Sequence, residues 1–231
     1  MLFYRRWLYS PDVTFKDFNG LISSCDCIVK PDNEKCGSGI QKVSLSQKTV
    51  IELYEWCVKN KMLVEQYLEQ CDEIKVFHPK SLNTIRIVTV GNKDKAEVFG
   101  AIIRVGVGES IVDNAHAGGL YAQINIKNGI IESDGIDVQG NKYDRHPDSK
   151  IMFKGYQIPM WNSIVETCCE AAKIIGNTLT GWDVVINSQR EIEFVEGNLM
   201  PGFDVMQSPL QIGYKKKLYS LIKEYSGIEM K

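Results

Sequence analysis

The sequence has no long hydrophobic run and almost no net charge, and both absences exclude classes of protein. No apolar stretch reaches the roughly 18 residues that a membrane-spanning helix needs. With 27 basic and 29 acidic residues among 231, the net charge of −2 gives no reason to expect nucleic acid or an anionic membrane as a partner. The first residues contain two arginines but neither an apolar core nor a small-residue cleavage site, so we do not expect them to form a signal peptide. We therefore expect a cytoplasmic globular protein.

A disulfide framework is also lacking. The seven cysteines are odd in number, two of them are adjacent, and their spacing is irregular, which predicts reduced thiols in a cytosol. Cys25, Cys27 and Cys36 suggest a partial zinc site, but their spacing fits no common zinc module. We interpret the cysteines as small apolar packing residues.

No internal repeat, low-complexity segment or flexible linker divides the chain. Strand patterns, many of them in hairpins, alternate with helical patterns, which indicates an α+β fold and not a doubly wound parallel sheet. The predicted strands are 25–29, 40–43, 62–67, 84–90, 96–105, 120–126, 130–133, 182–186 and 192–196. The predicted helices are 47–59, one that begins near Trp161 and ends at Gly176, and 214–225.

The hairpin formed by the last two strands carries a concentration of oxygen ligands. Strand alternation places Glu196 and Asn198 on one face. Asp183 shares that face if the loop has two or four residues; it lies directly opposite Glu196 with four and diagonally with two. Two close carboxylates repel unless a cation or proton lies between them, and oxygen-only ligands suit Mg²⁺ or Mn²⁺. We predict a magnesium site; the alternative is a solvated acidic hairpin tip.

A lysine and a glycine-containing loop follow the first predicted strand. Lys30 stands at the strand end, and the loop that follows contains Gly37 and Gly39. Such a loop can direct backbone N–H groups to phosphates, with the lysine as a point charge, although most loops of this kind bind nothing. The strand at 62–68 (MLVEQYL) can offer backbone groups to a purine edge, or be an ordinary core strand.

Taken in order, eight segments resemble the ATP-grasp superfamily, and most of all the sugar-transfer-associated ATP-grasp proteins found among bacterial cell-surface polysaccharide genes. The segments are KPDNEKCGSGI, LVEQYLEQ, SLNTIRIVTV, VDNAHAGGLYAQI, RHPDS, IPMW, GWDVVI and VEGNLMPGFD. The resemblance implies an ATP-grasp fold, with two α+β lobes that grip ATP. It implies a lead-in at 1–24, a small lobe at 25–72 and a large lobe at 73–231.

The resemblance also implies a role for individual residues toward Mg²⁺ and ATP. Asp183, Glu196 and Asn198 would hold one or two Mg²⁺ ions. Lys30 would contact the ATP phosphates, and Gly37, Ser38 and Gly39 would form a flap over them. Glu65 would face the adenine amino group, and the backbone of Gln66 and Leu68 would hold the adenine ring. Asp72, or else Glu73, would bind the ribose.

Two further residues would act on the reacting groups. Arg86 resembles the arginine that steadies the transferred phosphoryl group, where fixed positive charge stabilises the transition state. The alternative for Arg86 is a strand arginine with its head in solvent. Asn114 would contact phosphate or substrate, with Asp113 orienting it. His116 is a candidate base, but a lone loop histidine is usually not catalytic. His78 and His146 each precede a proline, and we expect them to be turn residues.

The implied reaction is a carbon–nitrogen ligation. ATP phosphorylates a small-molecule or sugar-linked carboxylate, and an amine attacks the acyl phosphate. The alternatives are a nucleotide-binding partner protein without turnover and a phosphotransferase that acts on a hydroxyl. Related ligases have a preceding domain, which we expect to be short or missing, and a further lysine in the small lobe. Arg5, Arg6 and Lys16 are the basic residues expected to replace that lysine.

Overall fold

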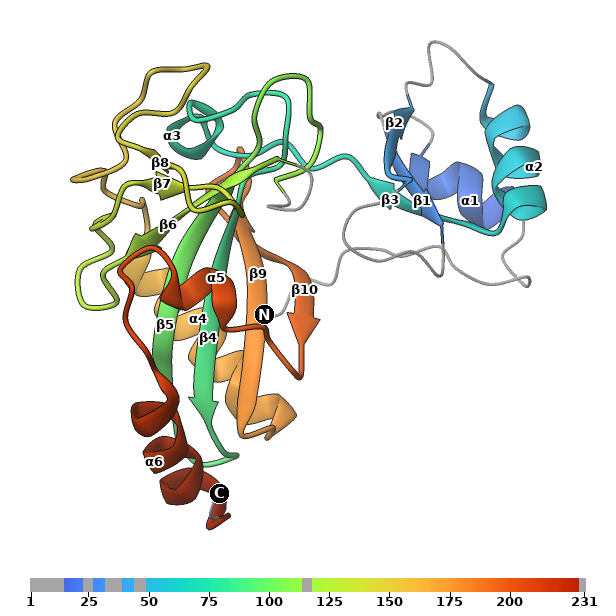
Figure 1. The fold of residues 1–231 in the computed structure, drawn as a ribbon. Coiled ribbons are helices and arrows are strands. Elements are labelled where there is room, and N and C mark those ends of the chain that lie inside the picture. The colour runs from blue at the N-terminus through green and yellow to red at the C-terminus, as the bar shows by residue number, and fades with distance from the viewer. Residues whose placement is uncertain (1–14, 23–26, 32–38, 44–48, 114–117, 229–231) are drawn as a thin grey trace. The chain divides into compact units, whose positions relative to one another are not determined.

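The computed structural model describes residues 15–22, 27–31, 39–43, 49–113 and 118–228. The chain divides into two compact units, Met1–Glu69 and Gln70–Lys231 (Figure 1). Each unit combines helices with an antiparallel sheet, so the predicted α+β class is confirmed. None of the described helices has the length and apolar composition that crossing a bilayer requires.

The first unit has a three-stranded sheet in the order β2-β1-β3. Its strands are β1 (Cys27–Pro31), β2 (Gln41–Val43) and β3 (Met62–Gln66), and its helices are α1 (Phe15–Ile22) and α2 (Val50–Asn60). Phe18 of α1 and Leu53 of α2 share a core with alternate strand residues, among them Cys27, Val29 and Val64. The intervening strand residues therefore face away from this core.

Helix α2 begins at Val50 because Thr49 caps it. The Thr49 side chain accepts a hydrogen bond from Glu52 N at 3.3 Å, and the Glu52 carboxylate accepts one from Thr49 N at 2.9 Å. This reciprocal capping box satisfies two backbone N–H groups that the helix leaves without a partner. The helix ends at Asn60, and the residue that caps it, Lys61, has a left-handed backbone with φ of 52°. The sequence pattern predicts the helix but not this cap.

The second unit contains a seven-stranded antiparallel sheet in the order β10-β9-β4-β5-β6-β7-β8. Its strands are β4 (Thr84–Gly91), β5 (Ala96–Val105), β6 (Leu120–Ile124), β7 (Gly135–Ile136), β8 (Lys142–Tyr143), β9 (Leu179–Ile186) and β10 (Ile192–Asn198). β4 lies between β5 and β9, which brings the middle of the chain beside its C-terminal third.

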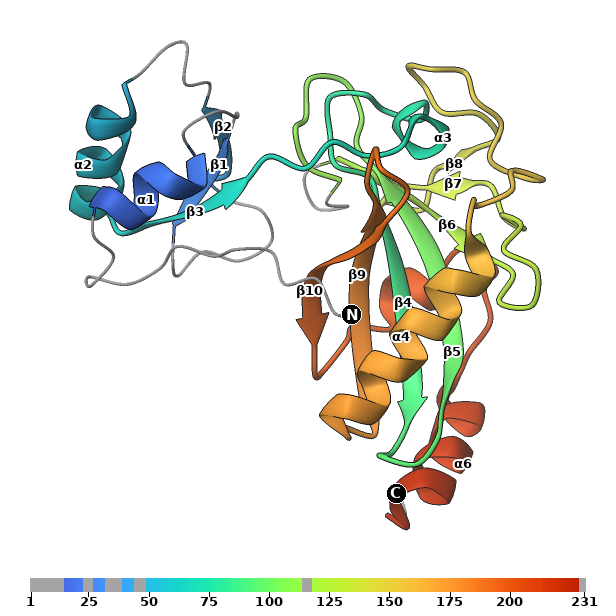
Figure 2. The same cartoon turned by 180° about the vertical axis from the view of Figure 1, so that it is seen from behind.

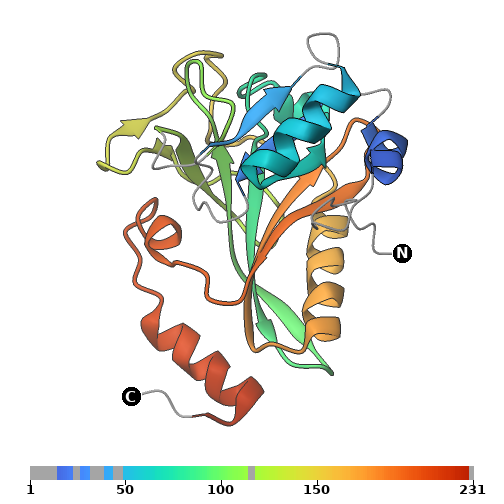
Figure 3. The ribbon, with the colours of Figure 1, turned by 90° about the vertical axis from the view of Figure 1, so that its right-hand side faces the viewer.

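Helices cover the two faces of this sheet unequally. The long helix α4 (Trp161–Ile175) packs along one face over the largest core, which includes Ile85, Ile87 and Val184 (Figure 2). Two shorter helices, α5 (Asp204–Gln207) and α6 (Lys215–Ser226), lie against the opposite face (Figure 3). There Met206 and Leu218 pack on residues such as Val88. A short helix, α3 (Asp72–Lys75), precedes β4.

The strand predicted at 130–133 is not a strand. Its backbone groups pair with two different segments: Ile131 N donates to Tyr156 O at 2.9 Å, and Glu132 N donates to Gln123 O at 2.9 Å. Because neighbouring residues have different partners, only isolated bridges form, and β7 continues the sheet instead.

Candidate functional site

A row of aligned residues crosses the large sheet on the face opposite α4. Glu196 pairs with Asp183, Asp183 with Arg86, Arg86 with Ile102, and Ile102 with Gln123. Directly paired residues of antiparallel strands project to the same side. The flanking residues of Asp183 pack in the core beneath α4, so the Asp183 side chain projects to the other face. The row therefore brings together groups from β10, β9 and β4.

Glu196 reaches its position opposite Asp183 by an unexpected route. Ile186 pairs with Ile192, so the loop contains residues 187–191 and has neither of the predicted lengths. A register shift between Phe194 and Glu196 then brings Glu196 directly opposite Asp183. A β-bulge of this kind inserts one extra residue and redirects a side chain. The bulge thus produces the pairing that we expected from a four-residue loop.

Two arginines hold both oxygens of the Asp183 carboxylate. Arg86 donates from Nε to Oδ1 and from Nη2 to Oδ2, the latter at 2.7 Å. Arg104, on β5, donates from Nη2 to Oδ2 at 3.0 Å. Asp183 is only 2% exposed, so these charge-assisted bonds form in a desolvated environment. Arg86 is thus paired with a buried carboxylate, and its head does not extend into solvent.

Arg104, which was not among the predicted site residues, has a second carboxylate partner. Its Nε lies 3.5 Å from Asp113 Oδ2. The Thr84 hydroxyl accepts hydrogen bonds from Arg104 Nε and Nη2 at 3.0 and 2.8 Å and donates to Asp113. Thr84 N also donates to Asp113 Oδ2 at 2.9 Å. Two arginines and two aspartates thus form a cluster in which the formal charges cancel.

Burial and pairing act in opposite directions on this cluster. Burial raises the pKa of the Asp113 carboxyl, although Arg104 and Thr84 favour its charged form. For Arg104, burial alone would lower the pKa, but the carboxylates of Asp113, Asp183 and Glu196 outweigh it and the pKa is raised. Glu196 pairs directly with Asp183, so its side chain projects to the side of the sheet on which this cluster lies.

The predicted metal ligands are brought to one corner of the sheet. Glu196 is exposed and lies opposite Asp183, and the half-buried Asn198 lies opposite Gly181, two residues along each strand. Among the described residues, no three His, Cys, Asp or Glu side chains are grouped closely enough to hold a metal. Two carboxylates and one amide oxygen remain a fitting donor set for Mg²⁺, which usually takes one or two carboxylates and completes its shell with water and phosphates.

In the first unit, charged residues occupy the sheet face opposite its core. Lys30 Nζ of β1 contacts Glu65 Oε1 of β3 at 2.6 Å, and Glu65 is 5% exposed. Lys42 of β2 pairs in register with Ile28, and its Nζ lies 3.7 Å from the centre of the Tyr67 ring. Lys42 was not predicted as a site residue. This face thus carries two cations and a buried carboxylate.

The other predicted nucleotide residues have separate positions. Gly39 has φ of +70°, and a Cβ there would lie 2.9 Å from Pro31 Cγ, so glycine is required. Leu68 is buried, and Asp72 is exposed at the start of α3. Gln66 ends β3, and Glu73, the alternative to Asp72 for the ribose contact, forms an ion pair with Arg190. The predicted residues that lie outside the described residues are Gly37, Ser38, Asn114 and His116, together with Arg5, Arg6, Cys25 and Cys36.

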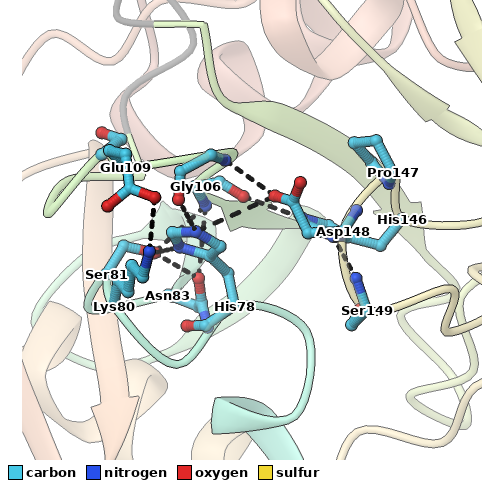
Figure 4. Close-up of polar contacts among 12 residues, drawn as sticks. His78, Lys80, Ser81, Asn83, Gly106, Glu109, His146, Pro147, Asp148 and Ser149 are labelled. Carbon is cyan, nitrogen blue, oxygen red and sulfur yellow. Dashed lines mark hydrogen bonds and ion pairs between the residues drawn. The ribbon is translucent and has the colours of Figure 1, made fainter.

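His78 and His146 lie at turns, as expected from the sequence, and both side chains are buried (Figure 4). His146 Nε2 lies 2.8 Å from Gly106 O, and His78 Nε2 lies 3.0 Å from Gly108 O. Both rings therefore hold the loop that leads from β5 to Asp113. Burial lowers the pKa of His146.

Comparisons with known proteins agree with this architecture. A family model described as sugar-transfer associated ATP-grasp matches residues 12–223. No curated protein matches the sequence. The structure is similar to the ATP-grasp ligase PsnB complexed with a phosphomimetic variant of its minimal precursor, Mg and ADP, with 15% identity and a TM-score of 0.56 over 97% of this chain and 54% of that one.

Two D-alanine–D-alanine ligases are also similar. For the enzyme from Coxiella burnetii the identity is 12% and the TM-score 0.51, over 96% of this chain and 52% of that one. For the enzyme from Bacillus anthracis the identity is 14% and the TM-score 0.51, over 96% and 61%. This chain therefore spans about half the length of these proteins. At such identities the likeness shows the fold.

Proposed function

We propose, from the premise that this chain belongs to the sugar-transfer associated ATP-grasp family, that it binds Mg²⁺ and ATP and works as an ATP-dependent ligase. The observation that carries the proposal is the Asp183 carboxylate, which is buried under two arginines and lies directly opposite Glu196. Arginine binds phosphate oxygens as well as carboxylates, and Mg²⁺ binds carboxylates. Mg²⁺ can therefore replace an arginine at the Asp183 carboxylate, while a phosphate replaces Asp183 at that arginine.

Asp183, Glu196 and Asn198 are the proposed metal ligands. Glu196 is exposed, so a cation can reach its carboxylate from solvent. Asp183 needs to release at least one oxygen from an arginine, and a nucleotide phosphate would offer that arginine a new anion. Metal and nucleotide should therefore bind together better than either binds alone.

The nucleotide contacts are proposed residue by residue. Lys30 would give the phosphates a point charge, and Lys42, on the same sheet face, is a second candidate for this role. The Glu65 carboxylate would accept a hydrogen bond from the adenine amino group. The remaining contacts are proposed for Gly37, Ser38 and Gly39 as the phosphate flap, the backbone of Gln66 and Leu68 for the adenine ring, and Asp72 for the ribose.

The proposed chemistry needs positioning and charge neutralisation, with no covalent protein nucleophile. Arg86 would leave Asp183 and stabilise the negative charge on the transferred phosphoryl group, and Asn114 would contact phosphate or substrate. Bound Mg²⁺ would supply further neutralisation of the phosphate charge. The acceptor carboxylate would become an acyl phosphate, and an amine would displace phosphate to form a carbon–nitrogen bond. Small-molecule or sugar-linked substrates of surface-polysaccharide synthesis are the proposed class.

Calorimetric titration of ADP with and without Mg²⁺ tests this proposal. Mg²⁺ should strengthen ADP binding to the unmodified protein. In Glu196→Gln, the increase in ADP affinity caused by Mg²⁺ should be smaller by at least about 10-fold, since even the loss of a residue that only supports a metal ligand costs this much in metal affinity. Glu193→Gln is the matched control, because Glu193 lies on the same strand but accepts a hydrogen bond from Asn187 at 2.8 Å. ADP affinity that does not respond to Mg²⁺ would overturn the proposed metal site.

Turnover separates a ligase from the other two candidate functions. Hydroxylamine traps acyl phosphates, so a ligase supplied with Mg·ATP and a suitable carboxylate should form a hydroxamate and release ADP in equal amounts. A phosphotransferase would release ADP and leave a phosphorylated hydroxyl compound with no hydroxamate. A partner protein would bind ADP and form neither product.

A further inference from the structure

Arg104 differs from Arg86 in the number of carboxylates that hold it. Arg86 donates both of its recorded side-chain hydrogen bonds to Asp183. Arg104 contacts Asp183 through Nη2 at 3.0 Å and Asp113 through Nε at 3.5 Å. Only Asp183 is a proposed metal ligand. Asp113 is therefore a second counter-ion for Arg104 that stays in place when Asp183 binds a cation.

Asp113 is fixed in this position by β4. Its carboxylate accepts hydrogen bonds from both the backbone N and the side-chain hydroxyl of Thr84. The same hydroxyl accepts hydrogen bonds from Arg104, so it connects the aspartate with the guanidinium group. Asp113 is 8% exposed, and these contacts account for its burial. The loop before it is anchored separately, since Gly108 N donates to Asp148 Oδ2 at 2.7 Å.

Charge balance gives this arrangement a consequence for metal binding. A half-buried guanidinium without any carboxylate partner is energetically unfavourable, so an arginine with only one carboxylate partner opposes its release. With Asp113 present, Arg104 still has a carboxylate partner after Asp183 has bound a cation. Without the Asp113 charge, the carboxylates that act on Arg104 would be those of Asp183 and Glu196, both proposed metal ligands, and the net charge of the cluster would be one unit more positive. Both effects would weaken the binding of a divalent cation.

We propose that Asp113 is a positioning residue that keeps Arg104 neutralised and thereby releases Asp183 for Mg²⁺ when nucleotide binds. The inference rests on the proposed function of Asp183 as a metal ligand. It concerns a residue that does not itself contact the metal or the nucleotide. It predicts effects of opposite sign on cation and anion binding.

The test uses Asp113→Asn, which keeps the shape of the side chain and removes its charge. Mn²⁺ affinity in the presence of saturating ADP is measured by electron paramagnetic resonance, and ADP affinity in the presence of a chelator is measured by calorimetry. Mn²⁺ affinity should fall on the order of 10-fold, because one unit charge beside a divalent ion has an effect of at least this size. Metal-free ADP affinity should stay the same or rise, since the cluster gains positive charge.

Asp148→Asn is the matched control. Asp148 anchors the same loop through Gly108, but no described contact links it to either arginine. Both affinities should equal those of the unmodified protein. Thr84→Val and Thr84→Ser form a second pair: the valine variant loses the hydroxyl that connects Asp113 with Arg104, and the serine variant keeps it. Mn²⁺ affinity should fall in the former and be preserved in the latter.

Equal losses of Mn²⁺ and metal-free ADP affinity in Asp113→Asn would overturn the inference, because a purely structural role weakens both. Unchanged Mn²⁺ affinity in Asp113→Asn and Thr84→Val would overturn it as well, while the proposed function would stand. If the unmodified protein shows no ADP-dependent Mn²⁺ binding, the proposed function fails, and this inference fails with it.

Discussion

The fully buried His146 ring provides a prediction about stability and pH. Its Nε2 lies 2.8 Å from Gly106 O, and its Nδ1 lies 3.2 Å from the backbone nitrogen of Asp148. The carbonyl requires a donor and the backbone N–H requires an acceptor, so the ring is neutral with its hydrogen on Nε2. Protonation would direct a second N–H at the backbone N–H of Asp148. We therefore expect acid to destabilise the second unit through this residue.

Replacing His146 with Phe preserves a ring of similar size and removes these hydrogen bonds. The buried Gly106 carbonyl loses its partner, and the loop before Asp113 loses an anchor. A lost neutral hydrogen bond together with an unsatisfied buried group costs about 2–4 kcal/mol in the free energy of unfolding. For a unit of this size, that corresponds to a fall in Tm of roughly 5–15 °C.

The pH dependence follows from the direction of the pKa shift. Burial lowers the pKa of His146 in the folded protein, so the unfolded chain binds the proton more readily. The stabilisation is complete above the unfolded pKa of about 6.5 and is lost as the pH falls below it, at no more than about 1.4 kcal/mol per pH unit. Urea unfolding at about pH 7.5 and about pH 5.5 should show this loss, and His146→Phe should lack it.

Tyr156→Phe is the control for this experiment. Tyr156 donates a hydrogen bond from its hydroxyl to Glu73 O, and burial raises its pKa further from the tested range. This variant should lose stability by the same amount at both pH values and keep the pH slope of the unmodified protein. If His146→Phe also keeps the full slope, the assignment of the buried neutral imidazole is refuted.

Three further substitutions test the packing of the two units. Leu53→Ala opens a cavity in the first core and should cost about 2–5 kcal/mol, seen as faster amide exchange in β1 and β3 with β4 and β5 unchanged. Gly129→Ala places a Cβ 2.4 Å from Trp161 Cγ at φ of +75°; it should cost about 2–5 kcal/mol and change the tryptophan fluorescence. Trp182→Phe removes the 2.8 Å bond from Nε1 to Thr89 Oγ1; it should lower the urea midpoint by an amount equivalent to about 1–3 kcal/mol.

Local patterns were sufficient to predict much of the fold. The hairpin of β4 and β5, helix α4 with its cap at Gly176, and the hairpin of β9 and β10 have strong periodicity, and the structure contains all three. Helix α4 has an apolar stripe at helical spacing, and the strands of the two hairpins are apolar runs joined by polar turns; both are local signals in the sequence. The prediction of a strand at 130–133 was wrong, because the residues of this segment pair with two different segments and do not form one continuous ladder.

The interactions that complete the candidate site depend on pairing between distant strands. Arg86 and Asp183 are 97 residues apart, and they meet only because β4 pairs with β9. Arg104 was open to prediction once β4 and β5 were taken as a hairpin, since that register places it opposite Thr84. Asp113 required knowledge of a loop path, which periodicity does not supply.

The most direct test of the central claim is an anomalous difference map from crystals grown with Mn²⁺ and a non-hydrolysable ATP analogue. The account predicts a manganese peak at coordination distance, about 2.0–2.2 Å, from carboxylate oxygens of both Asp183 and Glu196. It also predicts that at least one of Arg86 and Arg104 has moved from Asp183 to a phosphate oxygen. A bound nucleotide with manganese elsewhere, and with Asp183 still held by both arginines, would contradict the account.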